Sequence, residues 1–312
     1  MPHLYRQYGC IIYVRHRRKE RTGMTIDHRF GGAWTQEKLT RLSKYLTAYT
    51  RIFHANEQAR WYTTHYVDAF AGSGFRSDQP TKDSPVFVQD EEAAEFLSGS
   101  ATIALEVDPT FNKYWFVDRK PDHVNALNEL KARFPDRIVT ILQDDANHFL
   151  REWCRDLDWK KNRAVVFLDP YGAQVEWPTI QDIAGTNAID LWLLFPLGQA
   201  VNRMLTRHEP NASWAKRLDR LFGTQVWRDE FYRRSAQASL FEDSASTEKV
   251  ADFNSIGKFF IARLQSVFAE VSKSPLALFN SKNVPIYLLC FASANPKGGK
   301  TAVKIANHIL RS

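Results

Sequence analysis

Short apolar runs alternate with amphipathic segments along most of the chain, and this pattern predicts an α/β fold. The runs of strand length lie at residues 62–70, 114–119, 138–142, 163–168 and 189–195. Segments between them space their apolar residues three or four apart, as helices do, for example at 121–134 and 177–184. Because strands and helices alternate, we expect a doubly wound, mostly parallel sheet with right-handed crossovers.

The same pattern predicts how the fold begins and ends. Apolar residues at helical spacing predict a helix over 36–53, with Thr35 as its N-cap. Near the other end, two apolar runs at 276–280 and 285–292 flank the polar residues 281–283. This arrangement predicts a β-hairpin that adds a final antiparallel strand, and a helix over 301–310 then closes the chain.

Three stretches depart from the alternation. Residues 75–99 are polar and form an expected insert, and residues 199–270 form an expected helical insert after the fifth strand. Residues 1–23 show no periodicity and hold six Lys or Arg against one Glu. We expect a main domain over 24–312. The basic extension 1–23 is either an arm that contacts phosphates or the result of a start codon assigned ahead of Met24, and we favour the second explanation.

The composition is that of an ordinary globular protein, with 44% hydrophobic and 25% charged residues. No apolar run approaches the roughly 20 residues of a membrane helix, so we expect no membrane partner. Cys10, Cys154 and Cys290 are isolated, which argues against a disulfide scaffold or a metal site and favours the cytoplasm. The net charge is +7, but without residues 1–23 it is close to neutral and gives little support for a polyanionic partner.

The first motif, Tyr66-Val67-Asp68-Ala69-Phe70-Ala71-Gly72-Ser73-Gly74, joins the first strand to a glycine turn. A dinucleotide fingerprint needs a third glycine where this chain has Ser77. An acid at Asp68 suits a ligand with an ammonium group, such as S-adenosylmethionine. The motif therefore predicts a cofactor pocket that includes Asp68, Ala71, Gly72 and Gly74. An ordinary strand and turn with two glycines stays open as the alternative.

Acids also follow the next two strands. Asp118 ends the second strand, where a carboxylate can accept hydrogen bonds from both ribose hydroxyls of a nucleoside. Asp144 and Asp145 follow the third strand, and we place Asp145, beside Ala146, at the adenine amino group. Either acid could instead cap the helix that begins near Asn147.

The fourth strand ends in Asp169-Pro170-Tyr171-Gly172. This sequence resembles the D-P-P-Y motif of amino methyltransferases with one proline missing. The resemblance implies that Asp169 orients a target amino group and that Tyr171 stacks on a flipped base. The missing proline weakens the stacking role more than the role of Asp169. A β-turn with proline second and glycine fourth explains the same residues.

The helical insert mixes basic and aromatic residues, as surfaces that bind single-stranded nucleic acid do. Its aromatics are Trp214, Trp227, Phe231 and Tyr232. The excess of basic over acidic residues is small, so we favour the alternative that these aromatics belong to a core and the arginines to a solvated face.

Several of these segments together resemble the three-Cys-motif partner (TcmP) protein family. They are residues 32–35, 68–72, 167–172, 191–196 and 291–296, and the resemblance covers the chain from about residue 26 onwards. It implies a Rossmann-like class I methyltransferase fold and a separate protein with three cysteines as partner. The implied domain is 24–312, and residues 1–23 lie outside the resemblance.

These observations give one leading hypothesis and two others. The leading hypothesis is an S-adenosylmethionine-dependent methyltransferase, with an exocyclic amine of DNA or RNA as acceptor and Asp169, Pro170 and Tyr171 as its catalytic motif. The second is a methyltransferase-fold binding subunit without catalysis, which acts with the three-Cys-motif protein. The third, a nicotinamide oxidoreductase, is disfavoured by Ser77 and Asp68.

Overall fold

The computed structural model describes residues 33–72, 99–234 and 247–312. The extension 1–23, the predicted insert 75–99 except for Gly99, and Gly74 lie outside the described residues. Within the described part, no helix is long and apolar enough to cross a membrane.

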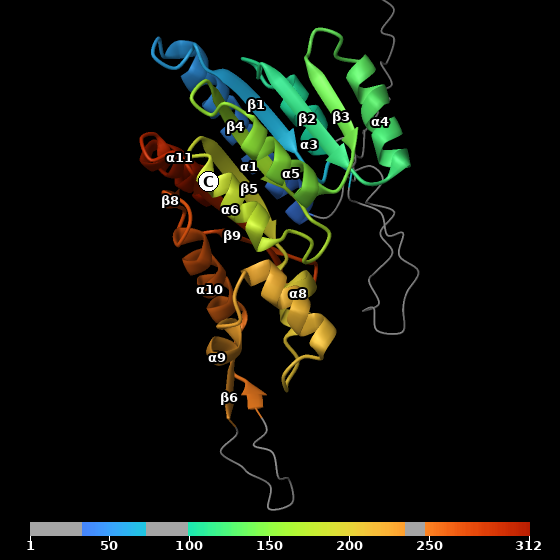
Figure 1. Ribbon diagram of the computed structural model, residues 1–312, viewed down its shortest axis with the longest axis vertical. Helices are drawn as coiled ribbons and strands as arrows, with labels where there is room; N and C mark the ends of the chain where they lie inside the picture. The colour runs from blue at the N-terminus through green and yellow to red at the C-terminus, as the bar shows by residue number, and fades with distance from the viewer. Residues whose placement is uncertain (1–32, 73–98, 235–246) are drawn as a thin grey trace, which may run out of the picture.

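A single large sheet forms the centre of the fold (Figure 1). Five parallel strands follow the order β3-β2-β1-β4-β5, and their bounds are β1 Thr63–Asp68, β2 Lys113–Asp118, β3 Val139–Gln143, β4 Asn162–Leu168 and β5 Ile189–Phe195. Strand β10 (Pro285–Ser293) lies antiparallel to β5. On its other side β10 pairs with β8 (Glu270–Val271) and β9 (Leu276–Phe279). The chain has a Rossmann-like, class I methyltransferase-type fold, in which a mainly parallel sheet ends in antiparallel strands.

The predicted strands are confirmed within two residues at each end, and so is the terminal hairpin. Strands β4 and β5 are buried on both faces, since each carries a continuous apolar run. The chain leaves β1 toward β2 and β3 and then crosses back to β4. The order therefore reverses between β1 and β4, the position at which ligands bind in open α/β sheets.

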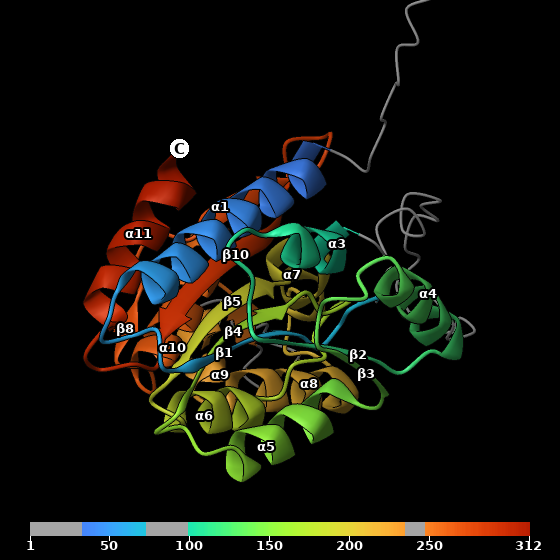
Figure 2. The ribbon, with the colours of Figure 1, turned by 90° about the horizontal axis from the view of Figure 1, so that it is seen from above.

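Two layers of helices cover the sheet (Figure 2). One face carries α1 (Ala33–Ala55), α3 (Gly99–Glu106), α4 (Pro121–Ala132) and α11 (Gly299–Arg311). The other face carries α5 (Ala146–Asp156), α6 (Trp177–Gly185), α8 (Ala212–Phe222) and α10 (Phe253–Gln265). Each layer closes a separate apolar core against its face of the sheet.

One local expectation needs correction, and another is confirmed. Helix α1 begins at Ala33, so Thr35 lies in its first turn and is buried rather than acting as the N-cap. In the region predicted as a helical insert, Trp227, Phe231 and Tyr232 are buried and Trp214 packs against the same core, which confirms the favoured interpretation of these aromatics as core residues. The remaining elements there are the π-helix η1 (Leu197–Val201), α7 (Asn202–Met204), α9 (Trp227–Phe231) and the small hairpin β6 (Tyr232–Arg234) with β7 (Thr247–Lys249).

Candidate functional site

The acids predicted from the sequence gather at one edge of the sheet. Asp68 is the last residue of β1 and Asp118 the last of β2. Asp169 directly follows β4, and Asp144 and Asp145 follow β3. Because these strands are parallel and in register, their carboxyl ends meet at the same edge, on both sides of the β1–β4 reversal.

Asp68 is completely buried beneath α3. Its carboxylate accepts a hydrogen bond from Ser100 Oγ at 2.6 Å and one from the backbone N–H of Phe70 at 3.3 Å. Burial raises the pKa of Asp68 to about 7, and the Asp169 carboxylate adds to the rise. The Ser100 hydrogen bond and the Lys38 ammonium oppose it. Near neutral pH this acid is therefore partly protonated, and a cation brought close to it would favour the ionised form.

Asp169 is paired with a lysine that the sequence interpretation missed. Lys38, in the second turn of α1, donates to Asp169 Oδ2, and its side chain is only 1% exposed. Burial lowers the pKa of Lys38, while the carboxylates of Asp169 and Asp68 raise it. One ammonium therefore interacts electrostatically with two carboxylates. The sequence does contain an indication, because Lys38 lies four residues before Leu42, on the apolar stripe of α1.

Asp118 lies at the end of β2 and is largely buried. Its Oδ1 accepts a hydrogen bond from the backbone N–H of Lys120 at 2.8 Å. His123 Nδ1, from the first turn of α4, lies 3.1 Å from Asp118 Oδ2 but makes no hydrogen bond. The carboxylate is thus held by its own loop and lies in close contact with a buried histidine ring.

Asp145 caps α5, which is the role that the sequence left open as the alternative to binding the adenine amino group. Its Oδ1 accepts from the backbone N–H groups of Asn147 at 3.0 Å and His148 at 3.1 Å. Its Oδ2 lies 3.7 Å from an Arg119 nitrogen. Asp144, which directly follows β3, instead contacts the His148 ring, with 2.9 Å between its Oδ2 and His148 Nδ1. Ala146, the first residue of α5, is buried.

The turn after β1 is tied to the neighbouring strand. Ala71 donates its backbone N–H to Val117 O at 3.1 Å, and Gly72 donates to Phe70 O at 2.7 Å. Ala71 and Gly72 therefore lie beside the end of β2, next to Asp118. Gly74 lies outside the described residues.

The segment after β4 bends sharply at Gly172, whose φ of +78° suits glycine. Pro170 is buried and Tyr171 is half-buried. Burial raises the pKa of nearby Tyr287, on β10, with further contributions from the charges of Asp169 and Tyr171, and Arg203 opposes them. The Tyr287 ring stacks on Trp34 of α1 at 5.4 Å. Aromatic rings and Arg203 thus surround the Asp169 end of the site.

The residues at this edge suit a nucleoside ligand with an amino-acid tail. One buried polar atom near this edge, Tyr66 Oη, makes no hydrogen bond within the described residues. Buried polar atoms are nearly always satisfied, so such atoms suit a ligand rich in hydroxyl and amino groups. The carboxylates supply acceptors for the same groups, so the donor set fits S-adenosylmethionine. No group of three or more His, Cys, Asp or Glu in the described ranges is arranged to hold a metal ion.

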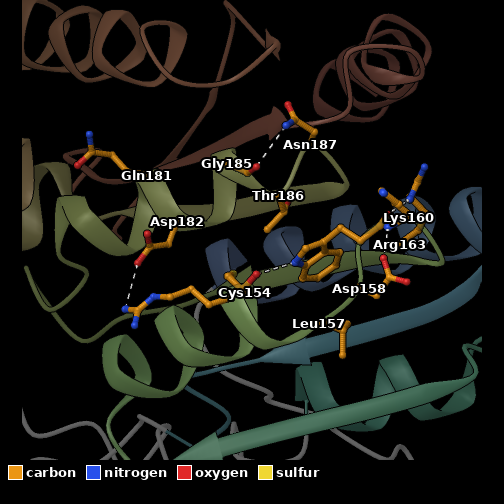
Figure 3. Close-up of a pocket in the computed structure, with 12 residues that line it drawn as sticks. Cys154, Leu157, Asp158, Lys160, Arg163, Gln181, Asp182, Gly185, Thr186 and Asn187 are labelled. Atoms are coloured by element: carbon orange, nitrogen blue, oxygen red, sulfur yellow. Dashed lines mark hydrogen bonds and ion pairs between the residues drawn. The ribbon is translucent and has the colours of Figure 1, made fainter.

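A cavity of about 700 Å³ opens at the opposite edge of the sheet (Figure 3). It lies between the ends of α5 and α6, and its lining includes Cys154, Trp159, Arg163, Asp182 and Asn187. Trp159 Nε1 donates to Cys154 O at 2.7 Å, which fixes one wall. None of the predicted site residues lines this cavity, so its size alone does not make it the candidate site.

Comparison with known proteins adds little to this picture. No protein-family model matches the chain, and no curated protein matches its sequence. One solved structure similar to it is the crystal structure of a DUF574 family protein from Streptomyces avermitilis. That match has a TM-score of 0.39 and 9% identity, and it covers 83% of this chain and 82% of the other. The description of the site therefore depends on the strand order and on the residues themselves.

Proposed function

We propose that this protein is an S-adenosylmethionine-dependent methyltransferase whose acceptor is an exocyclic amine of DNA or RNA. The observation that carries the proposal is the convergence of Asp68, Asp118 and Asp169 at the carboxyl ends of β1, β2 and β4. Open α/β sheets bind their ligands at this edge, beside the strand reversal. The acids also match the amino, ribose and acceptor groups that such a reaction brings together.

Each residue has a separate task in this proposal. Asp118 accepts hydrogen bonds from the ribose hydroxyls, and Asp68 pairs with the α-amino group of the cofactor. Ala71, Gly72 and Gly74 shape the pocket for its methionine part, and Asp145 with Ala146 lies at the adenine. The cofactor supplies a methyl group activated by a sulfonium.

Asp169 and its neighbours act on the acceptor. Asp169 accepts a hydrogen bond from the target amine, which fixes the direction of the nitrogen lone pair. Pro170 and Tyr171 form the wall beside it, and Tyr171 contacts the ring that carries the amine. By fixing this geometry before the reaction, the protein favours the transition state of the methyl transfer.

The family resemblance adds a protein partner to the proposal. We expect a three-Cys-motif protein to bind this chain in the cytoplasm and to complete or direct its activity. Co-purification of the two proteins from one cell extract, with an unrelated methyltransferase as bait control, tests the partnership separately from the chemistry.

Two variants test the chemistry. Transfer of radioactive methyl groups from S-adenosylmethionine to DNA and RNA is measured with wild-type protein, Asp169→Asn and Asp118→Ala. The proposal expects Asp169→Asn to bind S-adenosylhomocysteine as wild type does and to lose at least about 100-fold in turnover, the scale for a positioned polar group. It expects Asp118→Ala to lose binding, whereas Asp122→Ala, an exposed neighbour on α4, keeps it. Absence of binding to wild-type protein at millimolar ligand contradicts the proposal for the isolated chain.

A second function is favoured by one contact. Asp169 is already paired with Lys38, so the acid that would orient an acceptor has a partner within its own chain. This suits a binding subunit that retains the cofactor fold and serves the three-Cys-motif protein. In that case wild-type protein binds S-adenosylhomocysteine and methylates no nucleic acid, alone or with the partner.

A further inference from the structure

Helix α8 presents basic side chains on one exposed face. Lys216, Arg217 and Arg220 are exposed, and they lie on the same side of the helix because residues three and four apart are neighbours there. Leu218 and Phe222 are buried on the opposite side, where they belong to the core. We call Lys216, Arg217 and Arg220 the basic face of α8. The helix therefore directs its positive charge away from the core and into solvent.

The positive charge of α8 is only partly compensated. Asp219 is the only acid within this helix, and Arg228 binds its two oxygens at 2.7 and 3.1 Å. The Trp227 ring donates a further hydrogen bond to Asp219 at 2.8 Å. Asp219 is thus bound by a cation from outside α8. The side chains of Lys216 and Arg217 make no ion pair or hydrogen bond with the residues that the structure describes.

The basic face of α8 lies beside the loop that leaves β4. A nitrogen of Arg220 is 3.4 Å from Glu176 Oε1, at the end of the loop 169–176 that begins with Asp169. The backbone N–H of Glu176 donates to Asn147 Oδ1 at 2.9 Å, in the first turn of α5, so this part of the loop is held at the carboxyl edge of the sheet. Helix α8 also contacts α6 and α7, which lie around the same loop (Figure 1).

The contact between Arg220 and Glu176 does not withdraw Arg220 from a ligand. Both side chains are accessible to water, 55% of Arg220 and 34% of Glu176. An ion pair exposed to this extent contributes at most about 1 kcal/mol, so a phosphate can replace or join the carboxylate at the guanidinium. All three residues of the basic face can therefore take part in binding an anion.

A chain of phosphates is the anion that suits this face. An arginine binds phosphate through two parallel hydrogen bonds, and a lysine binds it as a point charge. The chain without residues 1–23 is close to neutral, so the face is a local concentration of charge and does not reflect a general excess. The aromatic residues of the same region belong to the core, which leaves the nucleic-acid backbone, and not the bases, as the partner of this surface.

We propose that the basic face of α8 binds backbone phosphates of the nucleic-acid strand that carries the acceptor base. The inference rests on the proposed function and goes further, because it places the strand beside the loop 169–176 and assigns its binding to three residues. Phosphate contacts fix the position of a strand but carry no sequence information. The binding supplied by α8 is therefore independent of base sequence and is shared by DNA and RNA.

The salt dependence of oligonucleotide binding tests this surface without knowledge of the acceptor. Fluorescence anisotropy measures the affinity of the full chain for labelled single-stranded DNA and RNA of mixed sequence, between about 50 and 200 mM KCl. Wild type is compared with the double variant Lys216→Gln/Arg217→Gln. The matched control is Lys300→Gln/Lys304→Gln, which removes two charges from exposed positions of α11, on the other face of the sheet. Calorimetry with S-adenosylhomocysteine is carried out on all three proteins.

The α8 double variant should bind both oligonucleotides at least about tenfold more weakly than wild type at the lowest salt. Its slope of log affinity against log salt should be smaller in magnitude by about 1.4, because each lost phosphate contact on a single strand removes about 0.7. The α11 control should keep the wild-type slope. All three proteins should bind S-adenosylhomocysteine equally, which also shows that the substitutions leave the fold intact.

Other outcomes overturn the inference and leave the proposed function distinguishable from it. If wild type binds the oligonucleotides but the two double variants show the same slope, α8 is not the phosphate surface, and the cofactor site stands. If wild type binds S-adenosylhomocysteine but neither oligonucleotide, the inference is likewise refuted. Loss of the three-Cys-motif protein in co-purification, with oligonucleotide binding unchanged in the α8 variant, would assign the face to that protein instead. Absence of S-adenosylhomocysteine binding refutes the proposed function, and the salt slope still decides whether α8 binds phosphates.

Discussion

Replacing Tyr45 with phenylalanine removes one hydroxyl from a buried polar network that joins α1 to the sheet. Tyr45 Oη donates to Asp190 Oδ2 at 2.7 Å, and Ser293 Oγ donates to Asp190 Oδ1 at 2.6 Å. All three side chains are buried. Burial raises the pKa of Asp190 to about 6, and the two hydroxyls oppose the rise. The carboxylate is therefore ionised at pH 8 and largely protonated at pH 5.

The size of the stability loss in Tyr45→Phe depends on whether the Asp190 carboxyl group is charged. A hydrogen bond to an ionised group contributes about 1.5–3 kcal/mol, and one between neutral groups about 1 kcal/mol. Without Tyr45 Oη the folded pKa of Asp190 rises further. A carboxyl group whose pKa is raised in the folded state stabilises the protein at low pH. This contribution is lost as the pH rises through the folded pKa. We therefore expect Tyr45→Phe to lower the free energy of unfolding by about 2–3 kcal/mol at pH 8 and by about 1 kcal/mol at pH 5.

Tyr66→Phe is the matched control. Tyr66 is as buried as Tyr45, on the same face of the sheet, but its hydroxyl makes no hydrogen bond within the described residues. Removing it should leave stability unchanged or raise it by up to about 1 kcal/mol, with no dependence on pH. Urea unfolding followed by circular dichroism at pH 5 and pH 8 measures both variants. Equal losses in the two variants, or a Tyr45→Phe loss that is no larger at pH 8 than at pH 5, would refute the reasoning.

Three other positions give further tests. Asp68 holds a proton up to about pH 7, so wild-type stability should fall by about 4 kcal/mol between pH 4 and 8 from this group, and Asp68→Asn should lack that fall in urea unfolding. Gly223→Ala should lower the free energy of unfolding by about 3 kcal/mol, because φ is +64° and a Cβ would lie 2.0 Å from the Trp177 ring; Gly185→Ala, with open space, should change it little. Burial raises the pKa of Cys154 to about 12, so mass spectrometry should find it alkylated by iodoacetamide only after unfolding.

The strand ends could be predicted from the sequence because their determinants are local. Short segments of five to seven residues, rich in β-branched, aromatic or other apolar residues, form β1 to β5, and an acid at or just after the end of such a segment lies at the carboxyl edge in any parallel sheet. Asp68, Asp118 and Asp169 could thus be placed together before their contacts were known. The alternatives for Asp145 could not be separated, since capping and ligand binding require the same residue at the same place.

Other features depend on contacts between distant parts of the chain. Lys38 meets Asp169 across 131 positions, and Ser100 meets Asp68 across 32. A lysine on the apolar stripe of α1 indicates a buried charge, but its partner depends on which end of the sheet α1 covers. The burial of Trp227 and Phe231 was predicted only from the small excess of basic residues around them, because aromatic residues serve equally in a core and on a binding face.

The central claim is that the carboxyl edge of the sheet binds S-adenosylmethionine, and hydrogen–deuterium exchange of the full chain with and without S-adenosylhomocysteine tests it most directly. The account predicts slower exchange at 68–72, 118–124, 144–148 and 169–173, and no change around Trp159 and Asn187 in the cavity at the opposite edge. Protection confined to that cavity, or no protection at saturating ligand, would contradict the account.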